Sequence, residues 1–394
     1  MSIASNQLRI ARELWARLQP LDRGVPARLQ TLLADRRFGS RDRRLYRELL
    51  FTALRQARAL APLPPGDEAG WAARVASVCA ESRETEAFRS AYLRADAASA
   101  NPLDLVPDWF AAECEAGAPP AEVADALLRR APLWVRMQTD DPDAALAEWA
   151  ARGWEARPHP ALPDAFRLPP ETNVSACAAY QEGHYEVQDL GSQAILASLE
   201  LASRSPGPRW LDACAGAGGK TLQLARLLGP SARIEATDIR PAALAELGAR
   251  TARAGLASRV RVTPRPAVTT RYDGVLVDAP CSGSGTWRRA PHLMACTTAA
   301  DLAGAAREQE AILRDAAGLV RPGGLLVYAT CSVARSENRG VAERFLSAQG
   351  DEFSAEPPAC TLGFPALAAG LAITPGSQEN DGFYVAAFRR RAPA

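Results

Sequence analysis

Apolar residues recur at helical spacing through the N-terminal third of the chain. Ile3, Ile10 and Leu14 begin the pattern, and leucines continue it after Pro26. A further helix is expected to begin beside Ser40, whose hydroxyl is of the type that caps helices, and weaker helical patterns extend to about residue 107. This pattern predicts an all-α domain over residues 1–128.

The next segment, residues 129–187, changes in character. A strand is expected at Leu133–Met137 and a helix at Asp143–Arg152. Short strands are expected near Ala165–Leu168 and Tyr185–Val187. We predict a small α/β unit that connects two larger domains.

From residue 188 onward, apolar strands alternate with helical segments. Strand–helix alternation of this kind predicts a mostly parallel, Rossmann-like sheet with its ligands at the carboxyl ends of the strands. The pair Gly323-Gly324 is expected to end the helix before it. The predicted strands are one ending at Asp212, then Arg233–Asp238, Val260–Val262, Tyr272–Asp278, Gly324–Thr330 and Phe383–Phe388. The third predicted domain is therefore an α/β domain over residues 188–394.

A glycine-rich loop follows the first of these strands, from Cys214 to Thr221. A phosphate-binding P-loop would need a glycine where Cys214 stands. The dinucleotide-binding pattern begins well at Gly216 and Gly218 but needs a glycine where Thr221 stands. Glycines at such a turn let a ligand approach the main chain. The loop therefore indicates a nucleotide-like cofactor, S-adenosylmethionine (SAM) included, or a plain strand–helix turn.

Polar side chains occupy three other strand ends. Asp238 ends the second strand, where a carboxylate can bind ribose hydroxyls or cap the following helix. Asp278 and Cys281 follow the fourth strand, and Cys331 follows the fifth. Buried cysteines are often inert, but two of them at neighbouring strand ends can face one pocket. The pattern predicts an active site at this edge of the sheet.

Charge and cysteine content narrow the possible classes of function. The chain of 394 residues has a formal net charge of +1, so a nucleic acid would have to be held by a local basic patch. Its eight cysteines lack C-x-x-C spacing and it has three histidines, so we expect no metal site and no disulfide scaffold. No apolar run reaches the ~20 residues that span a bilayer. We expect a cytoplasmic monomer without a membrane partner.

One basic patch is dense enough to bind nucleic acid. Clustered arginines of this kind could hold RNA phosphates, although a solvated helix face has the same composition. The six arginines of the patch are Arg36, Arg37, Arg41, Arg43, Arg44 and Arg47.

Lysine is almost absent from the chain. Lys220, in the glycine-rich loop, is the single lysine among 46 basic residues. Lysine carries a compact, flexible ammonium, whereas arginine carries a planar fork. Apart from chance, the exception indicates a site that requires a small cation.

Several motifs together resemble those of the RNA cytosine-5 methyltransferase family. The strongest are Asp278-Ala279-Pro280-Cys281 and Thr330-Cys331, whereas the glycine-rich loop alone is weak. The resemblance covers about residues 130–390, and Gly39–Leu54 is similar, less specifically, to a NusB-like RNA-binding domain. The remaining motifs are Val187-Gln188-Asp189, Trp287-Arg288-Arg289-Ala290-Pro291, Glu337-Asn338 and Asp381-Gly382-Phe383-Tyr384.

The resemblance implies a class I SAM-dependent methyltransferase that acts on RNA, in particular small-subunit ribosomal RNA. It implies that Cys331 is the nucleophile that adds to carbon 6 of cytosine. Asp278 would contact ring N3, Cys281 would assist the final elimination, and Lys220 would orient the pyrimidine or Asp278. Arg288 and Arg289 would hold the RNA backbone.

The same resemblance implies a SAM site and no metal. Its residues would come from the glycine-rich loop and from two strand ends. They are Cys214, Ala215, Gly216, Ala217, Gly218, Gly219, Lys220, Asp238 and Asp278.

The chain departs from the family pattern where the adenine of SAM is usually held. The family has an aspartate after the third strand, but Val260–Arg271 contains no acidic residue. An RNA-binding relative with weakened catalysis, acting in ribosome assembly, is therefore an alternative. A small-molecule methyltransferase is a third reading, against which the paired cysteines and the helical domain argue.

Overall fold

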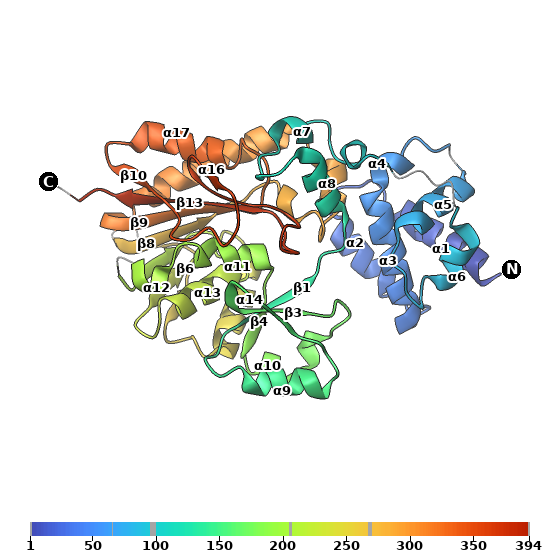
Figure 1. The fold of residues 1–394 in the computed structure, drawn as a ribbon, viewed down its shortest axis with the longest axis horizontal. Coiled ribbons are helices and arrows are strands. Elements are labelled where there is room, and N and C mark those ends of the chain that lie inside the picture. Colours follow the sequence, from blue (N-terminus) through green and yellow to red (C-terminus); the bar gives the residue numbers. More distant parts are fainter. Residues whose placement is uncertain (1, 65, 95–99, 205–206, 267–269, 393–394) are drawn as a thin grey trace. The chain divides into compact units, whose positions relative to one another are not determined.

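The computed structural model describes residues 2–64, 66–94, 100–204, 207–266 and 270–392 (Figure 1). The described residues form two compact units. One contains Met1–Ala112, Pro120–Arg129 and Trp287–Ala299, and the other contains Glu113–Pro119, Arg130–Thr286 and Ala300–Ala394. The predicted fold class is confirmed, because a helical N-terminal region is followed by a Rossmann-like mixed sheet. The three-domain division at residues 128 and 187 stays a prediction.

The first unit is helical. Its core is rich in leucine and also buries Trp71 and Phe88. Helices α1, α3, α5 and α6 pack against one another around this core (Figure 1). The helices are α1 (Ile3–Arg17), α2 (Val25–Leu33), α3 (Ser40–Arg55), α4 (Ala57–Leu60), α5 (Glu68–Val78), α6 (Glu86–Tyr92), η1 (Pro102–Leu105), α7 (Phe110–Glu113), α8 (Pro120–Leu128) and α15 (His292–Cys296).

The start of α3 corrects one prediction. Ser40 was expected to cap this helix, but Ser40 is its first residue and Gly39 occupies the cap position without a side-chain hydrogen bond. The carboxylate of Asp42 reaches back instead and accepts a hydrogen bond from the N–H of Gly39 at 3.3 Å. The cap therefore comes from the third residue of the helix.

The segment Trp287–Ala299 packs with the helical unit, although the residues before and after it in the sequence belong to the other unit. The ring of Trp287 is fully buried, with its centroid 5.7 Å from that of Trp109 and 5.8 Å from that of Phe110. The indole N–H of Trp109 donates a hydrogen bond to the carbonyl of Thr297 at 3.0 Å. An aromatic cluster thus fixes this segment within the unit.

The second unit begins with a small antiparallel sheet in the order β2-β3-β1-β4. Trp149 and Tyr185 fill its core, with ring centroids 4.9 Å apart. The strands predicted at 133–137 and 185–187 are confirmed, and β3 begins three residues before its predicted start. The elements are β1 (Leu133–Met137), α9 (Asp143–Ala151), β2 (Arg157–His159), β3 (Leu162–Leu168), η2 (Val174–Ala176), α10 (Ala178–Gln181) and β4 (Tyr185–Val187).

A larger mixed sheet follows in the order β11-β12-β13-β9-β8-β5-β6-β7, with β10 paired to β13. Strands β7, β6, β5, β8 and β9 run parallel, and β13 lies antiparallel to β9. The strands are β5 (Arg209–Asp212), β6 (Arg233–Ala236), β7 (Val260–Val262), β8 (Tyr272–Asp278), β9 (Val320–Thr330), β10 (Phe353–Glu356), β11 (Ala366–Leu367), β12 (Gly370–Ile373) and β13 (Phe383–Arg390). The helices are α11 (Leu190–Ala197), α12 (Leu201–Arg204), α13 (Gly219–Leu227), α14 (Pro241–Arg253), η3 (Ser284–Thr286), α16 (Ala299–Ala317) and α17 (Arg339–Gln349).

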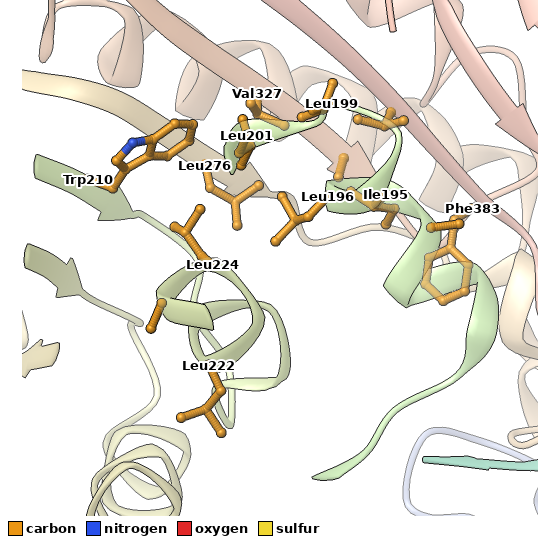
Figure 2. Close-up of a cluster of buried hydrophobic side chains, with 14 of the residues drawn as sticks. Ile195, Leu196, Leu199, Leu201, Trp210, Leu222, Leu224, Leu276, Val327 and Phe383 are labelled. Atoms are coloured by element: carbon orange, nitrogen blue, oxygen red, sulfur yellow. The ribbon is translucent and has the colours of Figure 1, made fainter. Parts of the chain in front are cut away.

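Both faces of this sheet are covered, which explains its nearly continuous apolar strands. Successive side chains of a strand point to opposite faces. Leu276 therefore packs with Trp210 and Leu224 on one face, which Figure 2 shows, whereas Val275 and Val277 belong to the cluster on the other face. Gly274 leaves room for Trp210, because a Cβ there would lie 2.3 Å from the indole ring.

The prediction that Gly323-Gly324 ends a helix is wrong. Helix α16 already ends at Ala317, and β9 begins at Val320. Gly323 has a φ of +74°, and the pairing of β8 with β9 shifts in register at this point. The two glycines therefore form an irregularity within a strand, of the kind that glycine at positive φ allows.

The strand order reverses at β5, which has β6 on one side and β8 on the other. In open α/β sheets, ligands bind beyond the carboxyl ends of the strands at such a point. Asp212 ends β5, and Asp278 ends β8. The fold thus brings the predicted site residues to the expected edge.

Candidate active site

Two cysteines meet at the carboxyl ends of neighbouring strands. Cys281 follows β8 and Cys331 follows β9, and Asp278 lies opposite Ala329 in the parallel pairing of these strands. The two sulfur atoms are 3.4 Å apart. The N–H of Gly285 donates to the carbonyl of Cys331 at 2.9 Å, which joins the two turns through the main chain.

A buried carboxylate holds both cysteine-bearing turns in place. Glu337 is fully buried, and its Oε1 accepts a hydrogen bond from the N–H of Ser282 at 2.8 Å. Its Oε2 accepts from the hydroxyls of Ser282 at 2.5 Å and Ser332 at 2.6 Å. Each serine directly follows one of the cysteines, so Glu337 fixes the position of both. Asn338 adds a second tie, since its Nδ2 donates to the carbonyl of Ser332 at 2.8 Å.

The contact between the two sulfur atoms affects the acidity of Cys281. The sulfur of Cys331 and then burial raise the pKa of Cys281 well above its usual value. Cys281 therefore keeps its proton at neutral pH and can donate it in a hydrogen bond to the sulfur of Cys331. A hydrogen bond donated to a thiolate stabilises the charged form. The geometry therefore lets the thiol of Cys281 act as a hydrogen-bond donor to its neighbouring sulfur.

Lys220 forms an ion pair with Asp278 beside the cysteines. Its Nζ lies 2.8 Å from Oδ2 of Asp278 and 5.4 Å from the centroid of the Phe383 ring. Burial disfavours the ammonium, but the charge of Asp278 and its hydrogen bond outweigh burial, so the pKa of Lys220 lies above its usual value. The lone lysine of the chain is thus a buried cation that fixes one oxygen of Asp278.

The glycine-rich loop turns directly into α13. Gly218 has a φ of +91°, and a Cβ there would lie 2.2 Å from Cδ1 of Leu247. The N–H of Ala215 donates to the carbonyl of Thr237 at 2.9 Å, which ties the loop to the end of β6. A Cβ on Gly219 would meet no atom within 4 Å, so the loop borders open space at the start of the helix. Burial, followed by the charge of Asp212, raises the pKa of Cys214, which therefore stays a thiol.

The end of β6 offers groups that fit a nucleoside. Oδ2 of Asp238 accepts a hydrogen bond from the N–H of Gly216 at 2.9 Å, and hydrogen bonds from Arg240 hold the pKa of Asp238 below its usual value. Asp238 does not cap α14, whose cap position is Arg240. Ile239 follows with 91% of its surface exposed, next to this carboxylate. A charged acceptor, an open glycine loop and an exposed apolar side chain together suit the ribose and adenine of SAM.

Asp212 lies beneath these groups and is fully buried. Its Oδ2 accepts a hydrogen bond from the hydroxyl of Thr221 at 2.7 Å. Burial raises its pKa to about 7, and the charge of Asp278 adds to the shift. Ionising Asp212 therefore costs free energy in the folded protein.

Much of the predicted basic patch is engaged within the helical unit. Arg37 pairs with Glu13 at 2.8 Å, Arg44 pairs with Glu84 at 2.7 Å, and Arg43 donates to the carbonyl of Leu33 at 3.0 Å. Arg288, which the resemblance gave to RNA, is only 6% exposed in this unit. Arg289 is exposed.

Three residues beside the predicted site had no role assigned from the sequence. The sequence places Glu337 in a motif but does not predict its hydrogen bonds, because its partners lie 5 and 55 residues away in the chain. Apart from its position next to Asp238, nothing in the sequence indicates a binding role for Ile239. Phe383 belongs to a motif, and Figure 2 shows its ring at the edge of the apolar cluster. Its contact with the ammonium of Lys220 joins residues 163 positions apart in the chain.

The described residues show neither a metal-binding cluster nor a membrane-spanning helix. No group of three or more His, Cys, Asp or Glu side chains in them is arranged to hold a metal ion. None of the helices within the described ranges has the length and apolar character needed to cross a membrane.

Comparison with known proteins points to one family. Residues 199–389 match the model of a family described as 16S rRNA methyltransferase RsmB/F. The chain is 34% identical over 326 residues to the ribosomal RNA small subunit methyltransferase B of Xylella fastidiosa (strain Temecula1 / ATCC 700964), a match covering 80% of this chain and 73% of that protein. It is 33% identical over 296 residues to the protein of the same name from Klebsiella pneumoniae subsp. pneumoniae, covering 73% and 66%.

Solved structures share the fold. The crystal structure of PH0851 has a TM-score of 0.76 and 20% identity, covering 99% of this chain and all of that one. The structure of NSun6 from Pyrococcus horikoshii with SFG has a TM-score of 0.61 and 18% identity, covering 70% of this chain and 96% of that one.

The sheet, with its glycine loop at the reversal of strand order and its polar strand ends, defines a SAM-dependent methyltransferase of the Rossmann-like class. The sequence similarity to the protein from Xylella fastidiosa also covers 80% of this chain, which is more than the methyltransferase sheet alone. The chain belongs to the ribosomal RNA small subunit methyltransferase B family, within the RsmB/F group.

Proposed function

We propose that this chain methylates carbon 5 of a cytosine in small-subunit ribosomal RNA, with SAM as the methyl donor and a covalent bond from Cys331 to the base. The observation that carries the proposal is the 3.4 Å approach of the sulfurs of Cys281 and Cys331, beside the ion pair of Lys220 with Asp278. The names of the relatives supply the class of RNA. The intact cysteine pair does not favour the alternative of a catalytically weakened assembly module.

Carbon 5 of cytosine is a poor nucleophile, and covalent catalysis removes that difficulty. The thiolate of Cys331 adds to carbon 6, forming a carbon–sulfur bond and moving an electron pair of the ring toward carbon 5. Asp278 contacts the ring at N3, where charge changes during the addition, and Lys220 keeps that carboxyl in place. The base must leave any stacked arrangement before it can reach these groups.

The methyl group that bound SAM supplies goes to carbon 5, after which that carbon carries both a methyl group and a proton. Water accepts this proton, the electron pair of the C–H bond returns to the ring, and the carbon–sulfur bond breaks to free Cys331 as a thiolate. Cys281 would assist this elimination, and the 3.4 Å distance between its sulfur and that of Cys331 supports this role.

SAM binding is proposed for the groups at the ends of β5 and β6. The residues from Cys214 to Gly219 would line the cofactor, and Asp238 would accept hydrogen bonds from the ribose. Arg240 now donates to both oxygens of Asp238 and would yield one of them to the ribose. Ile239 would cover the adenine, which supplies an apolar contact where an acid after β7 is absent.

The test is a methylation assay with methyl-labelled SAM and unmethylated small-subunit ribosomal RNA transcribed in vitro. Nucleoside mass spectrometry should detect 5-methylcytidine, and Cys331→Ala should abolish its formation while the protein stays folded and still binds SAM. Methyl transfer that survives in Cys331→Ala would exclude the covalent route. Methylation at another atom would exclude cytosine-5 chemistry.

A further inference from the structure

The helical unit contains a pocket that the proposed chemistry does not use. Its volume is about 560 Å³, within the range of roughly 300–1,000 Å³ typical of small-ligand sites. It lies between α2, α3 and the segment that leads into α15, and α3 contacts both other elements. Val25, Leu29, Leu33 and Leu54 form a buried apolar floor. All of its lining residues belong to the helical unit.

The pocket combines this floor with a basic rim. Arg43, Arg47 and Arg289 line it, and no carboxylate does. Arg43 is held by its hydrogen bond to the carbonyl of Leu33 at 3.0 Å. Arg47 is exposed, and within the part of the chain that the structure describes its guanidinium makes no hydrogen bond or ion pair. The rim therefore suits an anionic group, and the floor suits a flat apolar one.

The aromatic ring of Phe51 and the ring of His292 also line the pocket. Phe51 is only partly buried, so part of its side chain is open to an occupant. Burial lowers the pKa of His292, which is therefore neutral at pH 7 and can both donate and accept a hydrogen bond. A nucleobase stacks on aromatic side chains and has polar edges, and its phosphate is an anion.

We infer that this pocket binds one unstacked nucleotide of the RNA substrate, with its base on Phe51 and the apolar floor and its phosphates on the arginine rim. The inference rests on the proposed function for the nature of the ligand. It adds a second base-binding site, in the helical unit, to the site where the cytosine reacts. Single-stranded RNA is commonly held in this way, by bases stacked on side chains and phosphates bound to arginine.

A pair of tryptophan variants tests the pocket. Ala34 lines it at the exposed C-terminal end of α2, where the backbone is helical, so Ala34→Trp fills the space without straining the chain. Ala27 is exposed on the same helix but outside the pocket, which makes Ala27→Trp the matched control. A charge pair repeats the comparison, with Arg47→Glu inside the pocket and Arg36→Glu, also exposed, outside it.

The measurements are the Kd for unmethylated small-subunit ribosomal RNA without SAM, and the peptides that become crosslinked to that RNA under ultraviolet light. Ala34→Trp should weaken binding roughly tenfold, the order expected when one base loses its stacking partner. Arg47→Glu should weaken binding more than Arg36→Glu, and wild type should crosslink through the peptide with Phe51. Each variant is first checked by circular dichroism, and the charge pair decides the matter if Ala34→Trp does not fold.

Equal affinity of Ala34→Trp and Ala27→Trp for RNA would overturn the inference. Equal affinity is also the result expected if the pocket binds an apolar protein segment and not RNA. Methylation by wild type is measured separately. If the wild type methylates RNA but the two variants of each pair bind RNA equally well, the nucleotide-binding pocket is refuted and the proposed function stands. If the wild type crosslinks to RNA through the peptide with Phe51 but never methylates RNA, the proposed function is refuted and the nucleotide-binding pocket stands.

Discussion

The sulfur atoms of Cys281 and Cys331 lie 3.4 Å apart although 50 residues separate them in the chain. Two features produce this contact. The first is the parallel pairing of β8 with β9, which brings their carboxyl ends to one edge. The second is Glu337, which accepts hydrogen bonds from the residue after each cysteine. The sheet provides the approximate position, and the buried carboxylate fixes the turns.

Glu337→Gln tests this positioning. The glutamine amide would present its NH₂ group to N–H and O–H groups that now donate to a carboxylate, leaving a buried donor unsatisfied. We expect the free energy of unfolding to fall by about 1–3 kcal/mol, and kcat to fall roughly tenfold or more because the cysteine turns move. Urea denaturation and single-turnover methylation measure the two effects. Glu343→Gln, at an exposed position of α17, is the control, and equal kcat values in the two variants would contradict the positioning role.

Lys220→Arg tests whether the site needs a compact cation. The guanidinium keeps the charge but cannot take the place of an ammonium in a buried position between Asp278 and Phe383. We expect kcat/KM to fall by about 10²-fold, the cost of misplacing a catalytic group by about 1 Å. Arg226→Lys, the opposite exchange on the same helix, should keep activity near that of wild type. A fully active Lys220→Arg would show that charge alone suffices.

Asp212→Asn should change how stability depends on pH. The pKa of Asp212 is raised by burial to about 7, above its value in the unfolded chain. The folded state therefore binds the extra proton, and the stability of wild type declines as pH rises from about 4 to about 7. Asparagine lacks this titration, so the stability of wild type relative to Asp212→Asn should fall by about 2 kcal/mol between pH 5 and pH 7.5. Urea denaturation at both pH values measures it, and a constant difference would contradict the assignment.

Ile239→Ser should weaken SAM binding without harming the fold, because Ile239 is 91% exposed. If the side chain covers the adenine, its loss should raise the Kd for SAM roughly tenfold, since burial of an isoleucine contributes about 1.5–3 kcal/mol. Isothermal titration without RNA measures this directly. Val187→Ser, at a partly exposed apolar position of the same unit, is the control. Unchanged affinity in Ile239→Ser would place the adenine elsewhere.

The strands that end at Asp212, Asp278 and Thr330 could be predicted because they are long or strongly apolar and alternate with helices. Strands β10, β11 and β12 could not, since they have two to four residues each and are defined by their partners in the sheet. Strands β10 and β12 pair with β13, and β11 pairs with β12. Tertiary contacts likewise decide the place of Trp287–Ala299, which joins the helical unit through Trp109 and Phe110.

For the candidate site, the sequence supplied the residue types at the strand ends but not their connections. The family resemblance left open whether Lys220 orients the pyrimidine or Asp278, and its ion pair with Asp278 depends on the adjacency of β5 and β8. The role of Glu337 likewise depends on tertiary structure, because its partners come from two separate turns.

The central claim is the covalent bond between Cys331 and the base. The most direct measurement incubates the protein with SAM and small-subunit ribosomal RNA that contains 5-fluorocytosine, followed by a denaturing gel and mass spectrometry of the crosslinked peptide. Fluorine at carbon 5 cannot leave as a proton does, so the elimination is blocked and the adduct should persist on Cys331. An adduct on Cys281, or none while SAM and RNA are both bound, would contradict this account.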